Sequence, residues 1–116
     1  MILIIKERAT FEQVEQMLQT LRIYIKVAVD IERGILVGGG RQHADCEAEL
    51  LLDGSRQQDI WGADWTPFNQ SIDYESIINI RPSKNNRSMI IQDPDIRERV
   101  KQITQDLIGG YEIKYK

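Results

Sequence analysis

The sequence has a single cysteine and no long apolar stretch, and both features narrow what the protein can be. With only Cys46 available, an internal disulfide is impossible, which is typical of proteins from a reducing compartment. The apolar run at 2–5 is too short for the core of a signal peptide. No run approaches the roughly 20 apolar residues that a membrane helix needs. We therefore expect a cytoplasmic protein that makes no membrane contact.

The chain also lacks an excess of basic residues. Its 116 residues carry a formal net charge of −3, so the overall field does not attract a phosphate backbone. Hydrophobic residues make up 41% and charged residues 28%, which is the composition of a globular protein. Because no repeat, low-complexity tract or linker interrupts the chain, we expect one domain over residues 1–116. Nucleic acid is a disfavoured partner on this charge balance.

Two segments carry strong helix signals. In the first, at about 10–22, Thr10 and Gln13 have capping-box spacing and apolar residues follow on one helical face. In the second, at about 94–108, Pro94 suits the first helical position and apolar residues recur at intervals of three and four. These segments predict an N-terminal-half helix and a C-terminal helix.

Short β-branched and alternating stretches predict about six strands. The clearest is 25–31, which turns through Arg33 and Gly34 into a second apolar run. The other predicted strands are 2–5, 59–65, 76–81 and 88–92, and 111–116 is either a frayed tail or a short edge strand. Because hairpins join most of these strands, we expect an α+β fold with a mainly antiparallel sheet and helices on one face.

The segment 44–53 is ambiguous between helix and strand. Its Ala, Glu and Leu residues favour helix, yet apolar and acidic residues alternate from 45 to 52 with the period of a strand. Asp53 and Gly54 then form a strong hairpin turn signal. We favour a hairpin that leads into 59–65 over a helix that ends at Gly54.

The densest polar cluster holds the only histidine and the only cysteine. If the segment is extended, His43 and Asp45 point the same way, so both could ligate one metal ion, with Asp30 or Glu32 as a third ligand. A Cys46 nucleophile activated by His43 would instead require a helix. We favour a structural role for Cys46, as a small buried side chain.

Two other features of this region have competing interpretations. The triple glycine at 38–40 could cradle a phosphate, but a bulge or wide turn is the favoured interpretation because no phosphate motif follows it. Trp61 and Trp65 share one face of a predicted strand, and tryptophan is enriched in binding surfaces. Packing of both indoles against a helix is the favoured interpretation.

Polar side chains on an open face of the sheet could converge into a binding site. The candidate binding residues are Asp30, His43, Asp45, Trp61, Arg81 and Arg87. Arg81, Lys84 and Arg87 also surround a polar hairpin tip that could contact a nucleic-acid backbone. We favour the interpretation that this hairpin tip is exposed to solvent and binds no nucleic acid.

Four blocks of sequence are more specific together than singly. They are Val29-Asp30-Ile31-Glu32-Arg33-Gly34-Ile35, Gly38 to Asp45, Asp53-Gly54-Ser55-Arg56-Gln57 with Trp61-Gly62-Ala63, and Ile80-Arg81-Pro82 with Asn86-Arg87-Ser88. In these blocks the chain resembles a family of small bacterial proteins, the domain of unknown function numbered 5674. The resemblance covers nearly the whole chain. It implies a stand-alone bacterial domain, and it transfers no catalytic residue and no cofactor.

These observations favour a non-enzymatic binding or protein-interaction domain, because no complete catalytic constellation is visible. The edges of a small open sheet could pair with a partner protein or with a second copy of the chain, as a homodimer. One alternative is a small metal-assisted hydrolase that uses His43, Asp45 and Asp30. A second alternative is nucleic-acid binding through Arg81, Lys84 and Arg87.

Overall fold

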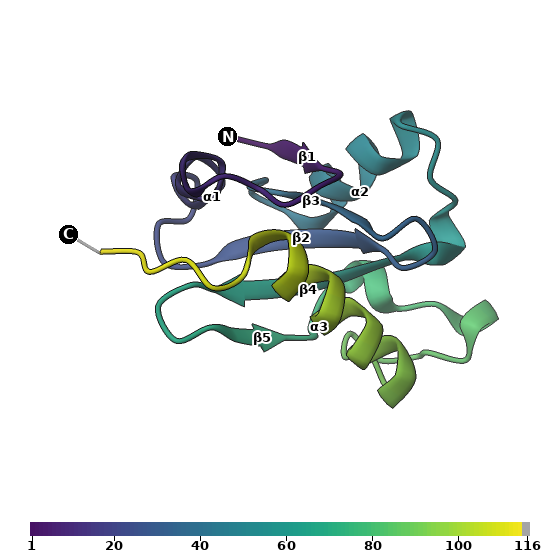
Figure 1. The fold of residues 1–116 in the computed structure, drawn as a ribbon. Helices are drawn as coiled ribbons and strands as arrows, with labels where there is room; N and C mark the ends of the chain where they lie inside the picture. The colour runs from purple at the N-terminus through teal and green to yellow at the C-terminus, as the bar shows by residue number, and fades with distance from the viewer. Residues whose placement is uncertain (115–116) are drawn as a thin grey trace.

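The computed structural model describes residues 1–114 and confirms the α+β class. Within those residues a five-stranded antiparallel sheet has the order β1-β3-β2-β4-β5 and is accompanied by three α-helices (Figure 1). The strands are β1 (Leu3–Ile5), β2 (Ile25–Asp30), β3 (Ile35–Gly38), β4 (Ile60–Thr66) and β5 (Ser71–Asp73). The helices are α1 (Phe11–Leu18), α2 (His43–Leu52) and α3 (Pro94–Ile108), with 3-10 turns at Gln57–Asp59, Ile77–Asn79 and Pro82–Lys84.

The β2–β3 hairpin forms where the sequence predicts it. The Asp30 carboxylate accepts the backbone N–H groups of Glu32 and Arg33, both at 3.0 Å, and so fixes the turn. Gly34 takes a φ of 68°, which a glycine adopts without a steric cost. The hairpin places β2 in the middle of the sheet, between β3 and β4.

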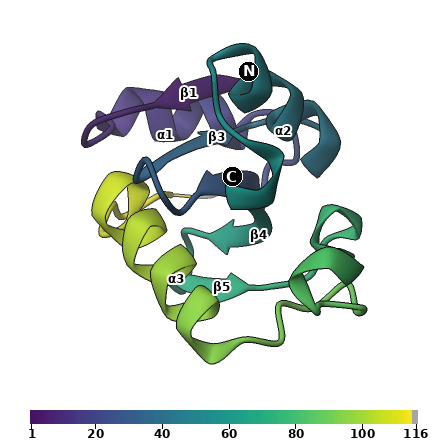
Figure 2. The same cartoon turned by 90° about the vertical axis from the view of Figure 1, so that its right-hand side faces the viewer.

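Helices cover both faces of the sheet, so the expectation that they cover one face is wrong. On one face, Val27 and Val29 of β2 pack in a core that includes residues of α1 and α3. On the other face, where α2 lies in Figure 2, Ala28 of β2 packs with Cys46 and Leu50 of α2. The middle of β2, from residue 27 to 29, is therefore buried by apolar side chains on both faces.

The two predicted helices are present, although α1 is shorter than expected. Thr10 caps α1, since its hydroxyl accepts the N–H of Gln13 and the Gln13 side chain accepts the N–H of Thr10. The α-helix ends at Leu18 instead of near residue 22, and a turn continues to Arg22, where a φ of 71° and a bond from the Arg22 N–H to the Leu18 carbonyl close it. None of the helices within residues 1–114 combines the length and apolar content that a bilayer crossing requires.

Within residues 1–114 the sheet has five strands rather than about six, because two predicted strands, 76–81 and 88–92, are absent from it and β5 forms where no strand was predicted. The predicted strand 76–81 is a 3-10 turn, and the predicted strand 88–92 forms only an isolated bridge through Ile90. Asn86 replaces a strand partner there: its amide donates to the carbonyls of Asn79, Ser88 and Ile90. Residues 111–114 form no strand, and residues 115–116 lie outside the described residues.

The segment 44–53 is helical, so the favoured hairpin interpretation is wrong and the alternative helix that ends at Gly54 is correct. Gly54 takes a φ of 98°, and the N–H of Ser55 bonds the Leu50 carbonyl at 2.9 Å. The alternation that suggested a strand is misleading because it includes Leu52, which is 83% exposed. Only one narrow stripe of α2 faces the sheet.

Candidate functional site

His43 is the first residue of α2, and its side chain contacts two residues of β4. Its Nε2 lies 3.0 Å from the Ala63 carbonyl oxygen and 2.9 Å from Oδ1 of Asp64, and the ring is almost fully buried. Asp45, two residues on, accepts the backbone N–H of Gln42 instead. Because residues two apart on a helix point to nearly opposite sides, the extended geometry that would pair His43 with Asp45 is absent.

Asp30 lies at the other end of β2. In the β2–β4 ladder Lys26 is opposite Asp64, so the His43–Asp64 contact and Asp30 are separated by four residues, about 13 Å along a strand. Within residues 1–114, no three His, Cys, Asp or Glu side chains form a group that could hold a metal ion. His43, Asp45 and Asp30 therefore do not form the three-ligand group that the metal hypothesis requires.

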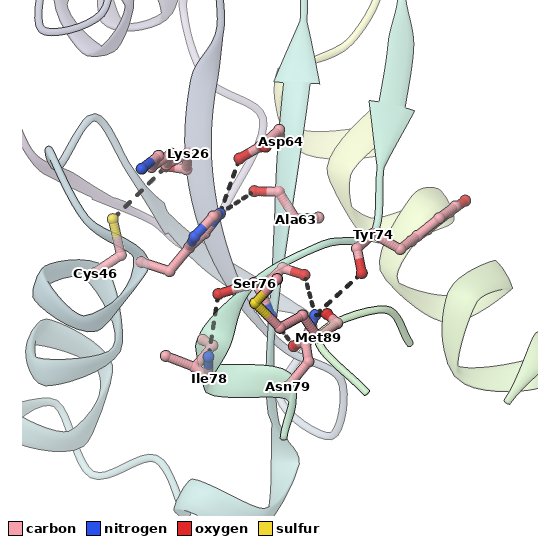
Figure 3. A network of polar contacts seen from close by, with 11 residues as sticks. Lys26, Cys46, Ala63, Asp64, Tyr74, Ser76, Ile78, Asn79 and Met89 are labelled. Carbon is pink, nitrogen blue, oxygen red and sulfur yellow. Dashed lines mark hydrogen bonds and ion pairs between the residues drawn. The ribbon is translucent and has the colours of Figure 1, made fainter. Parts of the chain in front are cut away.

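The Cys46 thiol is buried, and its surroundings make it unreactive. Its Sγ lies 3.6 Å from the Lys26 carbonyl oxygen, toward which it points in Figure 3. Burial raises the pKa of this thiol to about 11, and the nearby Asp45 adds to that increase while a hydrogen bond with the Gly40 backbone opposes it. A thiol with this pKa carries almost no thiolate at neutral pH, so the geometry supports the structural role expected for Cys46.

The triple glycine is explained by close packing. A Cβ at Gly39 would lie 2.0 Å from the Met1 carbonyl oxygen, and one at Gly40 would lie 3.0 Å from Sγ of Cys46. The N-terminal segment therefore leaves no room for a side chain at Gly39, and α2 makes a side chain at Gly40 tight. These contacts account for the glycines without a phosphate.

Arg81 is buried and joins three segments. Its Nη2 donates to Oε2 of Glu47 in α2 at 2.9 Å, and its Nη1 donates to the Gln57 carbonyl. The guanidinium carbon also lies 5.5 Å from the centroid of the Trp61 ring, which is itself buried. Burial lowers the pKa of Arg81 and the Glu47 carboxylate opposes that change. Arg81 and Trp61 thus already serve the packing of α2 and β4.

The three cations of the nucleic-acid hypothesis have different environments. Arg87 and Lys84 are exposed, whereas Arg81 is bound to Glu47. Lys84 and Asp30 both line a small pocket of about 390 Å³. The sequence did not predict that these two residues are neighbours. The other lining residues of this pocket are Glu32, Arg33, Gly54, Arg56, Gln58 and Asp59.

A larger groove, of about 860 Å³, lies where the end of α1 meets the β4–β5 hairpin and the C-terminal segment. Its lining residues are Glu15, Leu18, Gln19, Arg22, Ile23, Thr66, Phe68, Ile113 and Lys114. We name this feature the α1 groove. Sequence reasoning missed it because the three segments are far apart in the chain. The available signal was Ile23 and Phe68, two large apolar residues outside any periodic pattern.

Comparison with known proteins agrees with the resemblance seen in the sequence. The family model described as Protein of unknown function (DUF5674) matches residues 3–107, from β1 to the last turn of α3. No curated protein and no solved structure matches the chain. A binding role for the six candidate residues named from the sequence stays a prediction. The chain belongs to the family of the domain of unknown function numbered 5674.

Proposed function

We propose that this domain is a non-enzymatic binding module that holds an apolar segment of a partner protein in the α1 groove. The observation that carries the proposal is the lining of the groove: apolar side chains from three separate segments meet in one concavity with charged groups among them. Ligand sites in proteins are typically concave and mainly apolar, with a few polar groups that orient the ligand.

The size and exposure of the groove support this role. Its volume of about 860 Å³ lies within the range of ligand pockets in proteins, about 300–1,000 Å³. Phe68 is 75% exposed and Ile23 is 64% exposed, although both are large apolar residues. Apolar surface gathered in this way marks interaction sites in soluble proteins.

The charges among the lining residues favour an acidic partner segment. Arg22 and Lys114 are both exposed, and Glu15 is the carboxylate that accompanies them. The groove therefore has a local excess of positive charge on a chain whose net charge is −3. A segment with aromatic or aliphatic side chains next to an Asp or Glu would match both the apolar lining and this charge.

The contacts of the candidate site residues support a binding role of the α1 groove over an enzymatic role of those residues. His43 is held by β4, Arg81 is paired with Glu47, and the Cys46 thiol is buried against β2. A free buried thiol also suits the bacterial cytoplasm, where we propose that this domain acts.

The test is a selection of random peptides on the purified protein, followed by affinity measurements with two matched variants. Phe68→Ser removes the aromatic side chain from the groove, and Ile77→Ser removes a side chain of nearly equal exposure, 74%, that lies outside it. We expect the selected peptides to be rich in apolar and acidic residues, and to bind Phe68→Ser at least about tenfold more weakly. Binding to Ile77→Ser should equal that of the unchanged protein. Peptides that bind all three proteins equally would refute the proposal.

A further inference from the structure

We infer that two copies of this chain pair through the free edge of β1, which extends the sheet across a two-fold axis. Among residues 1–114, strands β1 and β5 are the two edges of the sheet, and β1 has a strand neighbour, β3, on one side only (Figures 1 and 2). This surface shares no residue with the α1 groove, so the inference goes beyond the proposed function and does not depend on it.

The two edges differ in chemical character. The β5 edge presents Ser71 and Asp73, and a charged side chain on an edge strand discourages pairing with another chain. Residues 1–5 contain no polar side chain at all. The first charged side chain is that of Lys6, whose ammonium bonds the Asp53 carboxylate at 3.0 Å. The β1 edge therefore lacks the charge that usually protects an exposed strand.

The β1 edge is self-complementary in one antiparallel register. If Leu3 lies opposite the partner's Leu3, then Ile2 lies opposite the partner's Ile4, and the same contact repeats across the axis. Residues directly opposite in such a pair point to the same face, with Cβ atoms about 5 Å apart. Ile2 is 36% exposed and Ile4 is 39% exposed, so the pairing would cover four exposed isoleucines.

The β1 edge is also ordered within the single chain, without a partner. The amino group of Met1 donates to the Gln16 carbonyl at 3.1 Å and to the Thr20 hydroxyl at 3.0 Å, which fixes the start of the segment against α1. Because the strand is already ordered, pairing costs less conformational entropy. Pairing with a second copy opposes apolar side chains throughout residues 1–5 and brings no like charges together within them.

The test is the mass of the protein in solution, measured by sedimentation equilibrium from about 10 μM to about 1 mM, which spans weak specific association. We expect the mass to rise from 13.5 kDa toward twice that value. Ile4→Lys and Ile2→Glu should each reduce dimer formation at least about tenfold, because each puts a charge against an apolar neighbour. The matched control is Ile80→Lys, at a residue that is 45% exposed and lies outside β1; it should dimerise like the unchanged protein.

The double variant Ile2→Glu with Ile4→Lys tests the register. In the inferred pairing each introduced carboxylate faces an introduced ammonium across the axis, so dimer formation should recover relative to either single variant. Circular dichroism checks that every variant folds, and amide exchange of β1 in the unchanged protein, which should slow as concentration rises, needs no variant. A monomer at every concentration, an Ile4→Lys dimer as strong as the control, or a folded double variant that stays monomeric would overturn the inference.

Discussion

The side-chain amide of Asn79 bonds both backbone groups of Gly62, in the manner of a neighbouring strand. The Gly62 N–H donates to Oδ1 of Asn79 at 2.8 Å, and Nδ2 of Asn79 donates to the Gly62 carbonyl at 2.9 Å. Nδ2 also reaches the carbonyls of Tyr74 and Met89 (Figure 3). Strand β5 pairs with β4 only at residues 64–66, so this amide satisfies part of the edge that β5 leaves open.

Replacement of Asn79 by alanine should therefore be costly. Asn79→Ala leaves the backbone groups of Gly62 without these partners in a fully buried place, and we expect the free energy of unfolding to fall by about 3 kcal/mol. The measurement is urea unfolding. Asn69→Ala is the control, because the hydrogen bond that Asn69 accepts from Ser71 is exposed, and its loss should cost less than about 1 kcal/mol. Equal effects of the two changes would contradict the strand-like role of Asn79.

Gly62 itself should tolerate no side chain. A Cβ at this position would lie 2.6 Å from Cβ and 2.7 Å from Oγ of Ser76, so Gly62→Ala should lower the free energy of unfolding by about 1–3 kcal/mol. Ser76→Gly relieves the clash but removes the hydroxyl that accepts the Ile78 N–H. In a double-mutant cycle the pair of changes should cost less than the sum of the single changes. Simple additivity would show that the two sites do not collide.

The Arg81–Glu47 pair should matter more than an exposed ion pair. Arg81→Ala leaves the Glu47 carboxylate partly buried without its partner and should cost about 3 kcal/mol of unfolding free energy. Arg81→Lys should also destabilise, because an ammonium lacks the fork that bonds Glu47 and the Gln57 carbonyl together. Lys6→Ala, which removes an exposed contact with Asp53, is the control and should cost less than about 1 kcal/mol. Thermal and urea unfolding would separate these cases, and a loss for Arg81→Ala as small as the control's would count against the assignment.

The buried Cys46 thiol predicts both slow labelling and a pH dependence of stability. In the folded chain its pKa is about 11 instead of the ordinary 9.0, so the unfolded chain loses this proton first. Stability that the neutral thiol provides is therefore complete below about pH 9 and is lost as the pH rises toward about 11. Over this pH interval the free energy of unfolding should fall further for the unchanged protein than for Cys46→Ala.

Disulfide-exchange labelling checks the same environment independently. An aromatic disulfide reagent at neutral pH should modify Cys46 only as fast as the protein opens, and rapidly once urea unfolds it. Labelling of the folded protein at the rate of the unfolded chain would show that the thiol is accessible.

The elements that the sequence predicted correctly are those whose signals are local. Thr10 and Gln13 satisfy one another's backbone groups within a single turn, and α3 begins at Pro94 as expected. The β2–β3 hairpin depends on Asp30 and Gly34, which act within the turn itself. Such contacts form between residues a few positions apart, so a reading of neighbouring residues is sufficient to find them.

The elements that were wrong or missed depend on contacts between distant residues. The pattern at 44–53 fitted both helix and strand. The helix is the structure that buries Cys46 and Leu50 against one face of the sheet. No strand forms at the predicted position 76–81, where Asn79 instead forms hydrogen bonds with Gly62, seventeen residues away. The α1 groove joins Arg22, Phe68 and Ile113, which no local pattern relates.

The sequence by itself determined the α+β class, the positions of α1, α3 and the central hairpin, and the family resemblance. The tertiary structure alone decided the state of α2, the covering of both sheet faces, and the contacts that commit His43, Cys46 and Arg81 to packing. The physical reason is that caps and turns are set by hydrogen bonds along the chain. Burial, in contrast, depends on which distant segments share the core, and local propensity is too weak to predict that.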